Sequence, residues 1–348
     1  MSEPPTAPSR ATATVLARLP GTNMLETVTV LRGELGAPHR GVIPVLAARS
    51  DTAGPIPRTV SLLTELSCDL QPHGWRIRRH TSKESRAAEA LLASDINVVA
   101  DVIGAEGGGD HSPVTIEFVG PISLAAQLYL HHGERVVQDH GARRDVGEAM
   151  ADGMGSLIPR VRQSLEGRDV VVRLDESWLH RTVMGQIPTA SGYRTLRAVA
   201  RAEAMQTLRG VAEAARAQSA TVEILVPPEQ DPREIDEQVA DAVLLNHPGS
   251  DPQAWEPVAA VVDSGRGIGV LLPELTQGTQ RQCLPQTGEL VRSITRPWRS
   301  VGLAPALLDT VSVAPGPGLE HATPDDVRRS LQLATDLAHG LHHTAQEA

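Results

Sequence analysis

Several kinds of residue are scarce in this 348-residue sequence, and each shortage excludes a class of protein. The two cysteines, Cys68 and Cys283, lie far apart and outside any Cys-x-x-Cys spacing, which argues against a disulfide framework and a cysteine-rich metal site. Aromatic residues make up only 2% of the chain, too few for a surface that stacks nucleic-acid bases. We expect the four tryptophans to be buried packing residues.

Long apolar runs and excess positive charge are missing as well. No run of about 18 apolar residues could span a membrane, and the acidic, proline-rich start lacks the apolar segment of a signal peptide. The formal net charge of -10 argues against nucleic acid and anionic membrane as partners, because both bind basic faces. These absences predict a cytoplasmic protein.

What the sequence does contain is a series of eight short apolar, β-branched runs with helix-like stretches between them. The runs are Ala13–Leu19, Gly41–Leu46, Val114–Val119, Asp169–Asp175, Thr221–Val226, Asp241–Asn246, Ile268–Pro273 and Asp309–Ala314. Strands that alternate with helices imply βαβ units and a parallel sheet. Eight such units predict an α/β fold, a (β/α)8 TIM barrel, whose chemistry lies at the carboxyl ends of its strands.

One domain is expected to occupy residues 11–348, after a disordered tail formed by residues 1–10. The region from about Pro72 to Ser112 is a candidate insertion. Proline after a capping residue predicts three helix starts in the second half, and apolar periodicity predicts one more helix. These features lie at Asp231-Pro232, Asp251-Pro252, Thr323-Pro324 and Leu196–Ala215. The apolar face expected for the helix after Thr323 consists of Val327, Leu331, Ala334, Ala338 and Leu341.

A series of short strings occurs in an order and at spacings that match a known family. The strings are Pro20-Gly21-Thr22, Gly33-Glu34-Leu35-Gly36, Gly120-Pro121-x-Ser123-Leu124-Ala125-Ala126, Gly133-Glu134-Arg135-Val136, Leu174-Asp175-Glu176, Pro188–Tyr193 and Leu196-Arg197-Ala198-Val199. From about Ala13 to Gly340, the sequence resembles short actinobacterial proteins related to the C-terminal barrel of cobalamin-independent methionine synthase.

The resemblance implies a barrel that transfers a methyl group from a reduced folate to the thiol of homocysteine. In that family a zinc ion in the barrel opening binds the thiol as thiolate, which is the nucleophilic form. The family's usual zinc ligands are a His-x-Cys pair on the fifth strand, an acid near the sixth strand and a cysteine after the eighth.

This chain departs from the family at those ligand positions. Glu223 and Leu225 stand at the His and Cys positions, and Pro317 stands at the last cysteine. Leucine and proline side chains cannot bind a metal. Three further family features are also replaced, namely the acid near the sixth strand, the Gly-Ser pair after the first strand and the acid near the second strand. Their positions hold Asn246-His247, Ala17-Arg18 and Val45.

The pair Asp175-Glu176 survives at the end of the fourth predicted strand, where the resemblance implies contact with the substrate amine. Adjacent strand residues point to opposite sides, so only one of the two faces the barrel axis. The alternative is a structural pair that accepts backbone N–H groups from neighbouring loops. Arg18 could bind an anionic ligand or pair with Asp175 or Glu223, and we favour the pairing. Our candidate substrate-binding residues are Asp175, Glu176 and Arg18.

Other chemistry has little support in the sequence. Glu223, His247 and Glu274 lie near successive strand ends and could bind a metal, but no close ligand pair accompanies them. Cys68 falls in a predicted helix and is expected to be buried and inert. The four C-terminal histidines are expected to be solvated, and they are His321, His339, His342 and His343.

Three functions remain open. The leading hypothesis is a methionine-synthase-like barrel that has lost its zinc ligands, needs no cofactor and is non-catalytic, binding at most a small amino acid or folate-like ligand. The first alternative is an active methyltransferase, metal-independent or zinc-dependent, that acts on a small thiol or amino acid. The second is a protein-interaction scaffold with an exposed apolar patch on its outer helices.

Overall fold

The computed structural model describes residues 10–78, 80–107, 110–189, 192–273 and 286–347. Its main feature is a seven-stranded sheet of order β1-β9-β8-β7-β6-β5-β4, in which every pairing is parallel. The strands are β1 (Thr12–Ala13), β4 (Val114–Val119), β5 (Val170–Asp175), β6 (Thr221–Leu225), β7 (Ala242–Asn246), β8 (Gly267–Leu271) and β9 (Val311–Ala314). The predicted parallel α/β sheet is confirmed with seven strands in place of eight.

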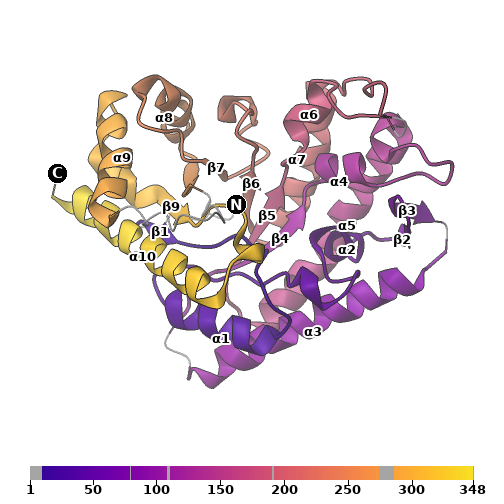
Figure 1. Ribbon diagram of the computed structural model, residues 1–348, viewed down its shortest axis with the longest axis horizontal. Helices are drawn as coiled ribbons and strands as arrows, with labels where there is room; N and C mark the ends of the chain where they lie inside the picture. The colour runs from indigo at the N-terminus through magenta and orange to yellow at the C-terminus, as the bar shows by residue number, and fades with distance from the viewer. Residues whose placement is uncertain (1–9, 79, 108–109, 190–191, 274–285, 348) are drawn as a thin grey trace.

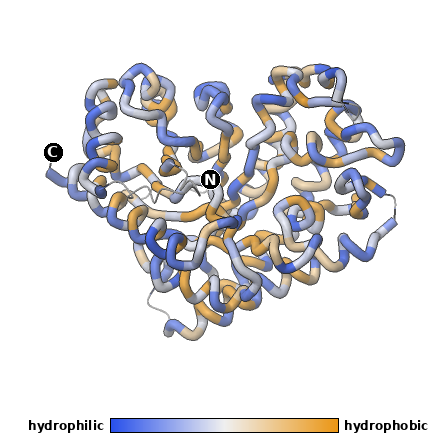
Figure 2. Tube along the Cα trace, viewed as in Figure 1, coloured by the Kyte–Doolittle hydropathy of each residue, from blue (hydrophilic) through white to orange (hydrophobic). Residues whose placement is uncertain are grey.

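Helices surround this sheet, with α1 and α3 at one end of the molecule and α6 at the other (Figure 1). They are α1 (Met24–Glu34), α2 (Pro55–Val60), α3 (Lys83–Ala105), α4 (Pro121–Gln127), α5 (His140–Ser164), α6 (Leu179–Val183), α7 (Arg201–Ala217), α8 (Glu256–Asp263), α9 (Thr287–Ser300) and α10 (Pro324–Gln346). Figure 2 shows that the hydrophilic segments gather at the periphery.

The predicted second strand, Gly41–Leu46, is not a regular strand. Val42 and Val45 form isolated bridges to Thr115 and Arg18, so this segment joins the two edges of the curled sheet without a continuous ladder. Pro44 has no N–H to donate, which interrupts a ladder. The carbonyl oxygens of Ile43 and Pro44 accept hydrogen bonds from buried Arg58 instead.

The first predicted strand, Ala13–Leu19, is also shorter than expected. Regular pairing with β9 is limited to Thr12–Ala13, followed by one bond from the Thr14 N–H to the Val313 carbonyl at 2.9 Å. On the other edge, which faces residues 40–45, side chains from inside the sheet bind two backbone groups. The Val15 carbonyl accepts from Arg173 at 2.7 Å, and the Ala17 N–H donates to Glu117 at 3.1 Å. Interior charges therefore take the place of a strand partner here.

An antiparallel hairpin, β2 (Ser67–Gln71) and β3 (Gly74–Arg78), corrects the prediction of a helix at Cys68. The Cys68 thiol is buried as expected, and burial raises its pKa to about 12. The hairpin and α3 together fill most of the candidate insertion at residues 72–112. Cys283 and nearly all of the expected tail at residues 1–10 lie outside the described residues.

Helix starts were predicted with mixed success. Thr323 caps α10 by accepting from the Asp326 N–H at 3.2 Å, as expected, and the predicted apolar face of this helix is buried. Asp251 and Asp231 each accept a backbone N–H two residues on, but each opens a 3-10 turn, and only the turn at Pro252–Trp255 continues into an α-helix.

The core contains the tryptophans as predicted, with Trp255 and Trp298 fully buried, Trp75 nearly so and Trp178 partly buried. Among the described residues, no helix is both long and apolar enough to cross a membrane.

Candidate functional site

An apolar layer fills the interior of the curled sheet near the carboxyl ends of its strands. Its members come from the segment after β1 and from four strands, and each is at most 5% exposed: Leu16, Leu225, Leu244, Leu271 and Ala314. In a barrel fold, catalytic groups come from this level. The five side chains of this layer contain only carbon and hydrogen.

The apolar layer fits because a neighbouring position has no side chain. A Cβ atom on Gly269 of β8 would lie 2.5 Å from Leu244 Cγ and 3.0 Å from Ser312 Oγ. Real Cβ contacts of 2.5 Å are essentially never found, so Leu244 and any larger residue at 269 exclude one another. The glycine allows the leucine to lie across its neighbouring strand.

A polar rim lies above the apolar layer. Arg18 Nη2 is 4.0 Å from Asp175 Oδ2, and Arg18 Nη1 is 3.9 Å from Glu320 Oε1. The depression there has no room for a water molecule and is lined by Leu16, Arg18, Gly316, Pro317, Gly318, Leu319 and Glu320. Arg18 therefore lies beside Asp175, one of its two expected partners, and away from the other, Glu223.

A charged layer lies deeper in the sheet. Glu117, Arg173 and Glu223 stand opposite one another on β4, β5 and β6, and all three are buried. Arg173 contacts Glu117 at 3.3 Å and Glu223 at 3.1 Å, and Arg40 forms a second ion pair with Glu223. Two arginines thus balance two carboxylates. Burying an arginine or a carboxylate without its partner would be costly.

The pKa shifts in the charged layer follow from burial and pairing. Burial alone would raise the pKa of the Glu223 carboxyl, but Arg40 and Arg173 together hold it below its ordinary value. Burial raises the pKa of Glu117, and Arg173 opposes that rise. Arg40, in turn, has its pKa lowered by burial. Glu223 is therefore an ionised partner of two arginines.

Glu176 has the structural role that we gave as its alternative. Its carboxylate accepts the backbone N–H groups of Ile122 and Ser123 at 2.9 and 3.0 Å and the Ser123 hydroxyl at 2.7 Å, all at the start of α4. It occupies the space beside Gly120, where a Cβ would lie 2.3 Å from Glu176 Oε1. Burial raises the pKa of Glu176 to about 8, although these hydrogen bonds oppose the rise.

Asp175 differs from its neighbour because it is only partly buried. Its carboxylate accepts from the Ser177 N–H at 3.0 Å and from the Ser177 hydroxyl, and it lies at the rim beside Arg18. Asp175 is thus the one of the two carboxylates that a ligand at the rim could reach.

The family's zinc site does not fit these residues. Leu225 lies in the apolar layer, Pro317 lines the rim, and Glu223 is held by two arginines. In the part of the chain that the structure describes, no three His, Cys, Asp or Glu side chains are grouped as metal ligands. Glu274, a member of the alternative metal set, lies outside the described residues.

The histidines that we considered have specific partners. His247 hydrogen-bonds Ser293 through Nε2 at 2.9 Å and accepts from the Gly249 N–H through Nδ1. The expectation of solvated C-terminal histidines is wrong for His342, which lies 2.7 Å from Asp309, while His343 is exposed. His339 packs its ring at 5.0 Å from His39.

Sequence reasoning missed Glu117, Arg173 and Arg40. The sequence did contain a signal for this layer, because one charged residue interrupts each of three successive apolar strands. The sequence alone does not give the strand register, so it could not show that these residues stand side by side.

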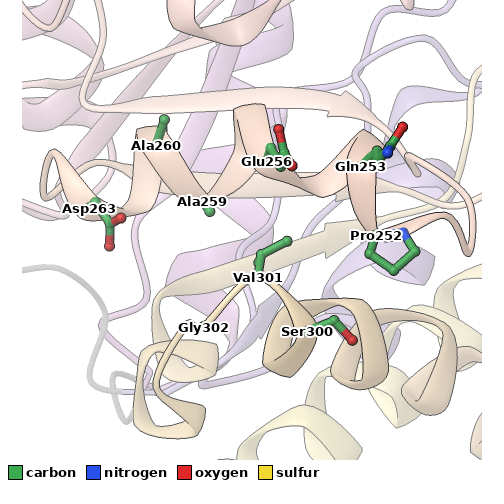
Figure 3. Close-up of a pocket in the computed structure, with 9 residues that line it drawn as sticks. All are labelled: Pro252, Gln253, Glu256, Ala259, Ala260, Asp263, Ser300, Val301 and Gly302. Atoms are coloured by element: carbon green, nitrogen blue, oxygen red, sulfur yellow. The ribbon is translucent and has the colours of Figure 1, made fainter.

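A larger hollow lies on the outside of the molecule. It has a volume of about 550 Å³ and lies between α8 and the residues that follow α9, where Ala259 faces Val301 (Figure 3). Glu256 and Asp263 stand at the two ends of its helical wall. None of these residues was expected to form a site.

The fold and this interior define a class: a parallel α/β sheet of the TIM-barrel type. Within it, a B12-independent methionine synthase from Shewanella sp. W3-18-1, solved in complex with selenomethionine, is similar to this chain. The TM-score is 0.61 at 9% identity, and the similarity covers 97% of this chain and 100% of that one.

A D-psicose 3-epimerase from Clostridium cellulolyticum H10 is less similar in structure. Its TM-score is 0.43 at 10% identity, and the similarity covers 97% of this chain and 96% of that one. No family model and no curated protein matches the sequence. The similarity therefore shows the fold alone.

Proposed function

We propose that this chain is a non-catalytic relative of the methionine-synthase barrel. In this proposal residues 11–348 form one cytoplasmic domain, and residues 41–45 act as an irregular second strand that closes an eight-membered (β/α)8 barrel. Hydrogen bonds of this segment to both neighbours support closure: the Ile43 N–H donates to the Thr115 carbonyl at 2.9 Å and the Val45 N–H donates to the Ala17 carbonyl at 2.7 Å.

One observation carries the proposal: the apolar layer occupies the level at which a thiol, a metal and a methyl donor have to meet. Zinc binds sulfur, nitrogen and oxygen donors, and Leu225 and Pro317 offer none of these. Glu223, which stands at the family's histidine position, neutralises two arginines, and releasing it to a metal would leave Arg40 without its carboxylate and Arg173 with Glu117 alone.

Metal content and ligand binding test this proposal together. We expect protein purified from zinc-supplemented medium and then dialysed to hold far less than one zinc per chain, and titration calorimetry with homocysteine and 5-methyltetrahydrofolate to show no heat of binding. One tightly held zinc per chain, or methionine formed from these two compounds, would overturn it.

A second candidate function is supported by the rim. Arg18 and Asp175 are partly exposed, and their charged atoms are 4.0 Å apart, longer than a direct hydrogen bond. A small amino acid could place its ammonium group on Asp175 and its carboxylate on Arg18. Methionine is then expected to bind wild-type protein and to lose binding in Asp175→Asn, while Asp251→Asn, an exposed control, keeps it. Equal affinity in all three proteins would exclude the rim as the site.

A further inference from the structure

One segment of this acidic protein carries only positive charge. Residues 177–202 contain no aspartate or glutamate, although the whole chain has a net charge of -10. The same segment contains Arg181, Arg194, Arg197 and Arg201. It includes α6, which directly follows β5, so it lies at the carboxyl-end side of the sheet (Figure 1).

The segment presents large apolar side chains to solvent. Pro188 pairs with Thr195, and the Leu196 N–H donates to the Ile187 carbonyl at 2.7 Å, so residues 187–188 lie beside residues 195–196. Tyr193 is 93% exposed, and Met184 is 54% exposed. In a chain with so few aromatic residues, a fully exposed tyrosine is an unusual placement.

This turn is held against α6. The Val199 N–H donates to the Thr182 carbonyl at 3.2 Å, and the Gln186 N–H donates to the Arg181 carbonyl at 2.8 Å. Trp178, at the start of α6, has two guanidinium groups near its ring, with Arg181 at 4.9 Å and Arg135 at 5.8 Å from the ring centre. These contacts hold Arg181 and Val199 in place before any partner arrives, which lowers the entropy that binding has to overcome.

Three of the four arginines are available for a partner. Arg201 is ion-paired with Glu234, but Arg181, Arg194 and Arg197 have no carboxylate within ion-pair distance among the described residues. Most other arginines have such a partner, including the fully buried Arg173. The unpaired cations and the two exposed apolar side chains share one exposed segment.

We propose that this surface, the arginine face, docks an acidic segment of a partner protein. The arginine face comprises Arg181, Met184, Tyr193, Arg194 and Arg197. Tyrosine, methionine and arginine are the residue types enriched in protein interfaces, and tyrosine and arginine dominate their hot spots. Tyr193 and Met184 supply the apolar anchor, while the three guanidinium groups select carboxylates and orient the bound segment.

A protein segment fits this surface better than a nucleic acid does. Three cations on a strongly acidic molecule cannot follow an extended phosphate backbone, and the remaining surface repels it. The proposal goes beyond the proposed function, because it holds whether or not the barrel interior is catalytic.

Fluorescence anisotropy with defined probes tests the arginine face on the full-length protein. The probe is a labelled 15-residue peptide of Asp, Glu and Leu, compared with a peptide in which Lys replaces the acids and with a 15-nucleotide single-stranded RNA. We expect binding of the acidic peptide alone, weakened at least tenfold in the triple variant Arg181→Glu, Arg194→Glu and Arg197→Glu. Tyr193→Ala should weaken binding at least fivefold.

Matched control variants separate the effect of the arginine face from the effect of a changed net charge. The triple variant Arg144→Glu, Arg328→Glu and Arg329→Glu makes the same charge change at exposed arginines of α5 and α10, and Leu25→Ala removes an exposed apolar side chain on α1. Both controls are expected to bind the peptide within twofold of wild type. Absence of peptide binding, preference for RNA, or equal weakening in the control triple would overturn the proposal, and none of these results bears on zinc content.

Discussion

The two layers inside the curled sheet differ in the chemistry of their side chains. In the deeper layer, Glu117, Arg173 and Glu223 are charged and paired. In the layer nearer the strand ends, Leu225 and Leu244 are apolar and packed. An enzyme of this fold usually has the reverse order, with packed branched side chains at depth and polar groups at the strand ends. The difference from the usual order therefore lies in the depth of the polar groups and not in their number.

The largest expected effect comes from breaking the charged layer. Arg173→Met leaves Glu117 without its cation and Glu223 with Arg40 alone. An unpaired buried charge destabilises a protein by about 3–5 kcal/mol. Urea unfolding measures this change. Arg328→Met, which removes an exposed arginine, is the control and should change stability by less than about 0.5 kcal/mol. A loss below about 1 kcal/mol in Arg173→Met would mean that the layer is not held by this arginine.

Opening the apolar layer should have the next largest effect. Leu244→Ala removes a fully buried side chain and leaves a cavity, for which losses of about 2–5 kcal/mol are typical. Thermal and urea unfolding should both report this loss of stability. Leu25→Ala, at a site that is 56% exposed, should leave the stability unchanged in both measurements. If Leu244→Ala binds homocysteine and the wild-type protein does not, then the apolar layer alone prevents binding in the wild-type protein.

Acid should weaken the fold through His39, which lies at the base of the sheet. Its Nδ1 accepts the Ala13 N–H at 3.0 Å, and burial, with His339 nearby, lowers its pKa from 6.5 to about 4. The unfolded chain therefore binds the proton more readily, so the free energy of unfolding falls as the pH drops from 6.5 to 4. His39→Gln keeps an acceptor and should flatten this decline, unlike His131→Gln at the surface. An unchanged decline in His39→Gln would assign it to other groups.

The smallest change in stability at pH 6 is expected from a substitution at Glu176, near the strand ends. Its pKa of about 8 lies above the ordinary 4.5, so the folded state holds the proton more tightly and loses stability as the pH rises from 4.5 to 8. Glu176→Gln mimics the protonated form and should change stability at pH 6 by less than about 1 kcal/mol. Relative to wild type it should gain stability between pH 6 and pH 9, measured by urea unfolding. A relative loss over that range would show that Glu176 is ionised.

Much of the fold could be predicted from apolar periodicity. The predicted run Val114–Val119 coincides with β4, and the predicted face of α10 is buried. The predicted second strand, Gly41–Leu46, forms only isolated bridges. This irregularity could not be predicted, because its residues are apolar and β-branched while Pro44 and Arg58 redirect its backbone. The hairpin at Cys68 was missed because its strands carry polar residues that pair with one another, among them Asp69 and Arg76.

The site was harder to predict than the fold. The sequence identified Leu225 and Pro317 as unfit for a metal, because side-chain chemistry is local. It did not reveal that Glu223 meets Arg40 and Arg173, because such pairs depend on register and on which side chains cross the interior. It predicted that only one of Asp175 and Glu176 faces the barrel axis and gave backbone N–H groups as alternative partners, but it did not show which of the two would bind the start of α4.

The contact between Gly269 and Leu244 fixes an order of events for any change that reopens this interior. A side chain added at position 269 would force Leu244 to shift, since its first carbon would lie 2.5 Å from Leu244 Cγ. A smaller residue at 244 removes this conflict, so we expect that replacement to come before a residue that bears a donor atom appears at 269. The double replacement should be tolerated better than Gly269→Ala by itself.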